Sequence, residues 1–159
     1  MSPSWGGQHS FAPGSQIPPL PVLVTGQTTQ LLYSVPGVIR GPGDLTTVFI
    51  CTSTDTAPQQ VGVEIFPRAG GGPCNDAAAT SVSVAPGGTG ILSTNPISNE
   101  LLDGQAPDSG VFGCNGSGRI LSTSKKLECT VFVGDGVNNP PSTSWQVTII
   151  AKLKQKAAN

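Results

Sequence analysis

Residues 144–154 read SWQVTIIAKLK and carry the clearest two-residue periodicity in the chain. Polar residues at positions 146, 148, 152 and 154 lie between apolar ones, which are Trp145, Val147, Ile149, Ala151 and Leu153. A period of two places successive side chains on opposite faces of an extended chain. The stretch therefore predicts one β-strand, with one face against a core and the other toward water.

The same alternation recurs upstream. In KLECTVFVG, residues 126–134, the inward positions are Leu127, Cys129, Val131 and Val133. In QVGVEIFP, residues 60–67, one face carries Val61, Val63 and Ile65, and the other carries Gly62 and a solvated Glu64. Further strands are expected at 21–26, 30–35, 45–54, 80–86, 91–95 and 119–124, separated by Gly, Pro, Asn and Asp turns. The fold class predicted is all-β, a two-sheet antiparallel sandwich of 7–9 strands, immunoglobulin-like first and jelly roll second.

Composition agrees with this pattern. The 159 residues include Gly 21 and Pro 15, while charged residues make up only 11% of the chain. Turns are therefore abundant, and the charged residues typical of surface helices are scarce. The length fits one domain, predicted for 21–159. Residues 1–20 hold Trp5, Phe11 and several prolines without periodicity, which predicts an extended N-terminal arm.

Charge and hydropathy narrow the functional classes. With a net charge of −1, the protein has no positive electrostatic potential to attract the phosphate backbone of DNA or RNA, so nucleic acid is not an expected partner. The chain has no apolar run of roughly 18–20 residues, and its first residues lack a basic region followed by an apolar one, so neither membrane insertion nor an export signal is expected. An even number of cysteines and few charges are typical of extracellular or particle-surface proteins.

The four cysteines predict disulfides in an oxidising compartment. Their spacings contain no C-x₂₋₄-C pair, so neither structural zinc nor a redox motif is expected. Cys51 and Cys129 lie in strands, and inward cysteines on facing sheets can come within bridging distance. Cys74 and Cys114 lie in glycine-rich loops. Cys51–Cys129 with Cys74–Cys114 is the favoured one of three connectivities; in a reducing compartment all four would be thiols.

One stretch resembles a known family. Residues 45–93, with TTVFICTSTDTAPQQVGVEIF followed by SVSVAPGGTGIL, resemble the middle of immunoglobulin-like sandwich modules of bacterial surface proteins, such as cell-adhesion-related and fibronectin type III-like domains. Shared features are a small polar turn after one strand, Val-x-Val in another, and an Ala-Pro-Gly turn. The resemblance implies a scaffold for spacing or adhesion. The Pro-rich arm before the first strand departs from that pattern.

Catalytic and metal chemistry finds little support. The one histidine, His9, lies in the arm, away from any predicted strand. Most carboxylates sit beside Gly, Pro, Asn or Ser, where Asp commonly bonds its own turn. Asp135, Asn138 and Asn139 lie in the loop 134–139, which has neither the charge nor the length of an EF-hand calcium loop. We therefore expect no catalytic residue, no metal and no cofactor, and hence no enzyme.

Two functions are favoured at this stage, and an enzyme stays open only because sandwich folds can host sites that sequence does not show. The first is a structural or interaction subunit of a self-assembling coat, fibre or appendage, whose arm contacts a neighbouring copy through Trp5 and Phe11. The alternative is a monomeric adhesion or carbohydrate-binding module that uses the loops 68–76, 103–118 and 134–142. Sugar sites usually present exposed aromatic rings, and Phe112 is the one aromatic residue in these loops.

Overall fold

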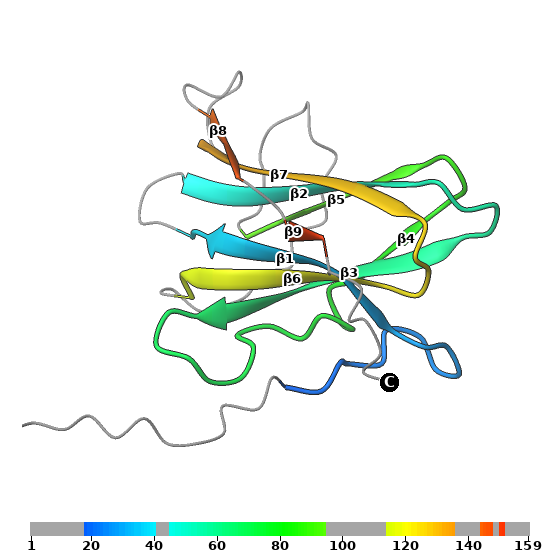
Figure 1. Cartoon of the computed structure of the whole chain (residues 1–159), viewed down its shortest axis with the longest axis horizontal. Coiled ribbons are helices and arrows are strands. Elements are labelled where there is room, and N and C mark those ends of the chain that lie inside the picture. Colours follow the sequence, from blue (N-terminus) through cyan, green and yellow to red (C-terminus); the bar gives the residue numbers. More distant parts are fainter. Residues whose placement is uncertain (1–17, 41–44, 95–113, 136–143, 148–149, 152–159) are drawn as a thin grey trace, which may run out of the picture.

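Two layers of antiparallel strands form the part of the protein that the computed structural model describes, residues 18–40, 45–94, 114–135, 144–147 and 150–151 (Figure 1). For the last two ranges the description is limited to the backbone. These residues contain no helix. Their strands are β1 (Gln30–Val38), β2 (Leu45–Ser53), β3 (Gln59–Pro67), β4 (Val82–Val84), β5 (Thr89–Ser93), β6 (Gly116–Ser122), β7 (Leu127–Asp135), β8 (Ser144–Val147) and β9 (Ile150–Ala151).

The strands form a five-stranded sheet in the order β4-β3-β6-β1-β9 and a four-stranded sheet in the order β5-β2-β7-β8. All strand pairs in them are antiparallel. β1 and β2 lie in different sheets and pair with β6 and β7, so the two pairs interlock across the sandwich. Strands B and C have the same relation to E and F in immunoglobulin-type sandwiches. The predicted antiparallel β-sandwich is confirmed.

The final strand differs from its prediction. A single strand was expected over 144–154, but β8 pairs with β7 in the four-stranded sheet, whereas β9 pairs with β1 in the five-stranded sheet. The chain thus passes from one sheet to the other within eight residues. A two-residue alternation reports which positions face a core, and it is blind to the sheet that provides the neighbour. The final segment thereby borders both sheets on one side of the sandwich.

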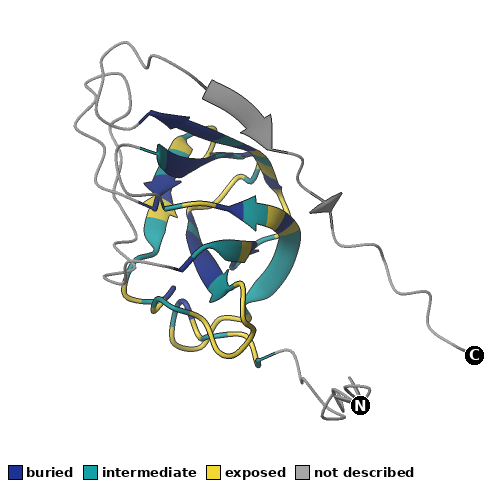
Figure 2. Cartoon of the chain, turned by 90° about the vertical axis from the view of Figure 1, so that its left-hand side faces the viewer, coloured by how far each residue is buried: buried dark blue, intermediate teal, exposed yellow. Residues whose placement is uncertain are grey.

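The main core lies between the two sheets (Figure 2). On β7 the alternation is confirmed: Leu127, Val131 and Val133 are buried, and Cys129 packs against the core from a half-buried position. The largest fully buried side chains come from both layers and include Phe49, Leu92, Ile65 and Ile120. Facing β-branched and aromatic side chains give this interface its apolar character.

β3 is buried on both faces, contrary to the prediction of one solvated face. Glu64 was expected in water, yet it is only 4% exposed. The outer face of the five-stranded sheet is covered by the segment that precedes β1 and by the β3–β4 loop. A second apolar cluster forms there from Leu23, Ala77 and Leu121, with Leu31 packed against it. Residues 21–26, expected as a strand, form a non-strand segment that contributes Leu23 to this cover.

The two disulfides join Cys51 to Cys129 and Cys74 to Cys114, the pairing that the sequence favoured. Their geometry corrects one expectation. Cys51 and Cys129 were placed on facing sheets, but they are direct partners on the adjacent strands β2 and β7, with a Cα–Cα distance of 4.1 Å. The Cα atoms of Cys74 and Cys114 are 6.3 Å apart. Cys74 lies beside β3 and Cys114 just before β6, both strands of the five-stranded sheet. Neither bridge connects the two layers.

Candidate functional site

A buried ion pair lies on the outer face of the five-stranded sheet. Glu64 on β3 and Arg119 on β6 are direct partners in the register, and each is 4% exposed. The Arg119 Nε–H donates to Glu64 Oε2. Two opposite charges removed from water must satisfy each other, and losing one partner of such a pair typically costs about 3–5 kcal/mol. The pair is therefore a fixed element of this face.

The rest of the Arg119 guanidinium holds the chain that precedes β1. Its Nη1 donates to the Pro18 carbonyl oxygen at 3.0 Å and its Nη2 to the Pro19 carbonyl oxygen at 3.1 Å. The guanidinium carbon lies 5.1 Å from the centroid of the Phe66 ring. An arginine suits this position because its planar fork offers several donors in fixed directions and stacks on aromatic faces. Proline carbonyls suit it because an extended Pro-rich chain has no internal hydrogen bonds.

Leu23 fixes the other end of this segment. It is 8% exposed and packs with Ala77 and Leu121. Gly62 on β3 makes room for it, because a Cβ at position 62 would stand 2.9 Å from Leu23 Cδ2 and 3.0 Å from the Ala77 carbonyl oxygen. We call residues 18–23 the strap, and we call the surface beneath it the seat, formed by Gly62, Glu64, Phe66, Ala77, Arg119 and Leu121.

A tight turn connects the strap to β1. The Leu23 N–H donates to Thr29 Oγ1 at 3.1 Å, and the Gln27 N–H donates to the Val24 carbonyl at 3.1 Å. Gly26 has a φ of +81°, a left-handed conformation that glycine adopts without steric cost. This turn reverses the chain, so the strap runs back over the sheet to which β1 belongs, as the blue segment beneath β3 and β6 shows (Figure 1).

The seat offers the chemistry of peptide recognition. It presents two directed N–H donors to backbone carbonyls, an aromatic face, and an apolar patch against which one aliphatic side chain packs. Extended and Pro-rich segments are bound by these means in many recognition domains. The negative charge of Glu64 balances Arg119, and the strap that the seat holds is an uncharged segment whose carbonyl groups accept from Arg119.

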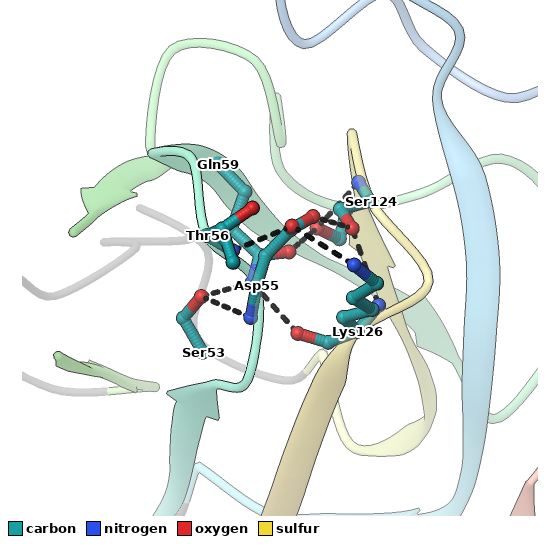
Figure 3. Close-up of polar contacts among 7 residues, drawn as sticks. Ser53, Asp55, Thr56, Gln59, Ser124 and Lys126 are labelled. Atoms are coloured by element: carbon teal, nitrogen blue, oxygen red, sulfur yellow. Dashed lines mark hydrogen bonds and ion pairs between the residues drawn. The ribbon is translucent and has the colours of Figure 1, made fainter. Parts of the chain in front are cut away.

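A second polar cluster ties two turns at one end of the sandwich (Figure 3). The Asp55 carboxylate, in the β2–β3 turn, accepts hydrogen bonds from Ser124 Oγ and from the Thr56 N–H at 2.7 Å. Lys126 Nζ lies 3.4 Å from it and is largely exposed. Ser124 and Lys126 belong to the β6–β7 turn, so the carboxylate links two connections that both cross between the sheets.

These hydrogen bonds lower the pKa of Asp55 to about 2, with the Ser124 bond as the largest cause and the Thr56 N–H next. Hydrogen bonds to the charged form of a carboxyl favour ionisation. A carboxylate with this pKa is a poor general base near neutral pH, because a catalytic base works best with a pKa near the operating pH. The cluster is better explained as a structural tie than as a catalytic group.

Beneath Asp55, the side chain of Gln59 continues the network into the protein. Its Nε2 donates to Ser53 Oγ at 2.7 Å and to the Lys126 carbonyl at 2.9 Å, while its Oε1 accepts from Ser122 Oγ at 2.7 Å. Gln59 is 3% exposed. Buried polar groups of this kind rigidify a structure when every member is satisfied.

The predicted site residues meet different outcomes. The structure pairs the four cysteines, and Asp76, like Asp55, bonds its own turn by accepting the N–H groups of Ala78 and Ala79. Asp135 is the last residue of β7 and is 8% exposed, so it lies in a strand end where a loop was expected. Trp5, His9, Phe11, Phe112, Asn138 and Asn139 lie outside the described residues.

Among the described residues, no group of three or more His, Cys, Asp or Glu side chains could hold a metal ion. That portion of the chain also contains no helix long and apolar enough to cross a bilayer. The seat was missed from the sequence. The signal that could have found it is a pair of opposite charges, Glu64 and Arg119, within otherwise apolar strands.

Comparison with protein families, with characterised proteins and with solved structures found no match to this chain.

Proposed function

We propose that the protein is a non-enzymatic structural subunit that assembles with copies of itself through its N-terminal arm. One observation carries the proposal: Arg119 donates two hydrogen bonds to the backbone carbonyls of Pro18 and Pro19, where the arm joins the domain. An arm that emerges from a fixed point on a rigid sheet can be aimed at a neighbouring subunit. The first residues of most domains are poorly ordered unless contacts of this kind tie them down.

The two disulfides support a non-reducing environment, and we propose an extracellular or particle-surface location. Trp5 and Phe11 supply the large apolar contact area that an arm uses to reach its neighbour.

The test compares the full-length protein with a variant that lacks residues 1–17. This deletion keeps the strap, so the domain retains its anchored cover. We expect the full-length protein to form a large assembly by light scattering and the deletion variant to form a much smaller species that still unfolds cooperatively. A Trp5→Ala/Phe11→Ala variant should reproduce the deletion. Equal sizes for the full-length protein and the deletion variant would refute the proposal.

A further inference from the structure

The contacts that hold the strap do not depend on which copy of the chain supplies it. Pro18 and Pro19 bond to Arg119, a residue 100 or more positions away, and Leu23 packs against the distant Ala77 and Leu121. A strap from a second copy would make the same contacts in the same seat. Whether a seat holds its own strap or that of a second copy therefore depends on the link to β1 and on the protein concentration.

The outward side of the strap is apolar. Within the described residues, the large hydrophobic side chains that are exposed are Leu20 at 37%, Val22 at 63% and Ile39 at 37%. The first two belong to the strap, and Val22 directly precedes its anchoring residue Leu23. Two exposed apolar side chains on one short segment give a partner a small apolar surface to contact. Because the exchange keeps the contacts of the seat, these side chains remain on the outward side, where a second copy can pack against them.

Opening the link between strap and β1 breaks two hydrogen bonds and leaves the contacts of the seat unchanged. The turn in this link is closed by the Gln27–Val24 backbone hydrogen bond and the Leu23–Thr29 bond, and it pivots on Gly26 at φ +81°. Glycine populates extended and left-handed conformations about equally, so the turn can straighten without a steric penalty. A straightened link carries the strap away from its own sheet.

We propose that the strap of one copy occupies the seat of a second copy, and that the reciprocal exchange forms a closed pair. This inference rests on the proposed function, because it supplies the first contact of the assembly. The partner is a second copy of this chain, and the recognised group is the Pro18–Pro19 backbone with Leu23. Residues 1–17 then extend from the pair toward further copies.

The experiment uses two full-length variants of different mass, Leu23→Cys and Ala77→Cys, which place one thiol on the strap and one in the seat. The two are mixed, incubated and mildly oxidised. We expect a disulfide-linked dimer that contains both variants, identified by its mass on a non-reducing gel. A chain that carries both cysteines and cross-links only within itself, while the mixture gives no mixed dimer, would overturn the proposal.

A matched control removes the donors of the seat. Adding Glu64→Leu and Arg119→Met to the Ala77→Cys chain replaces both charges, so no lone buried charge is created. We expect the yield of mixed dimer to fall at least several-fold while the variant still unfolds cooperatively. An unchanged yield would contradict the role given to Arg119.

Truncations separate this inference from the proposed function. Removing residues 1–17 should reduce the full-length assembly to an exchanged dimer, and removing residues 1–20 should give a monomer, because Pro18 and Pro19 are lost. A truncated protein of full assembly size would refute the proposed function while the cross-link persisted. A full-length assembly without the mixed dimer would refute the exchange alone.

Discussion

Asn75 Oδ1 accepts the backbone N–H of Ile65 at 2.8 Å, and the side-chain amide of the same residue donates to the Val63 carbonyl at 2.7 Å. The Cys74 N–H also donates to the Ile65 carbonyl, at 2.7 Å. β4 pairs only with Gln59–Val61, so these groups occupy the edge of β3 beyond the end of β4. A loop thus imitates a neighbouring strand. Covering an edge in this way prevents uncontrolled pairing with other chains.

Asn75→Ala should expose this edge. The Ile65 N–H and Val63 carbonyl lose their partners, which costs about 1–3 kcal/mol when the groups are buried. We expect a fall of that size in the free energy of unfolding, and faster hydrogen exchange of the Ile65 amide. Asn75→Asp is the matched control, because it keeps the acceptor for Ile65 and loses only the donor to Val63. Its Ile65 amide should stay protected.

Each disulfide should stabilise the fold by about 4 kcal/mol in the chain-entropy picture, because the loops that they close span 78 and 40 residues. Cys51→Ser/Cys129→Ser and Cys74→Ser/Cys114→Ser should each lower the free energy of unfolding in urea by about this amount. The second variant should also loosen the β3 edge, because Cys74 bonds to Ile65. Unfolding curves that coincide with that of the parent protein would contradict the prediction.

Asp55 should make the fold sensitive to acid. Its pKa in the folded protein, about 2, lies below its ordinary value of 3.8, so the carboxylate binds its proton more readily when the chain is unfolded. Its stabilising contribution is complete above about pH 4 and is lost as the pH falls toward 2. Asp55→Asn should flatten the stability profile over this interval. Ser124→Ala should flatten it more than Lys126→Gln, because the Ser124 bond is the larger cause.

Tyr33 connects the two layers, because its Oη donates to the Leu127 carbonyl at 2.6 Å from β1 to β7. Burial, and then the charge of Glu128, raise the pKa of Tyr33 above its ordinary 10.0. Its contribution to stability is therefore complete below about pH 10 and declines above it. Tyr33→Phe should cost about 0.5–1.5 kcal/mol at neutral pH. The difference between parent and variant in urea unfolding should shrink as the pH rises past 10.

The sequence predicted those features that depend on local alternation. β7 illustrates this, since Leu127, Val131 and Val133 face the core as expected. The pairing of cysteines followed from strand and loop positions, although the sheet that each pair occupies did not. Period-two patterns define faces, and they do not say which strand lies alongside.

The seat depended on information that local patterns lack. The burial of Glu64 requires that the strap cover the outer face of the sheet, and the strap itself reads as a strand from its apolar residues. Its proline carbonyls become meaningful only beside Arg119, 100 residues away. Contacts of that sequence separation arise from topology, so one sequence read by its periodicity could not supply them.

The placement of the Cys51–Cys129 bridge has a mechanical consequence. Tension applied to the two ends of the chain passes through this bond, and the 78-residue loop that it closes, which contains the Cys74–Cys114 bridge, is shielded from the pull. About 270 Å of contour length is thereby withheld from extension at roughly 3.4 Å per residue. A fibre made of such proteins would extend less under load than one without the bridge, because the residues between Cys51 and Cys129 would not be pulled out. Refolding after release would then start from this closed loop.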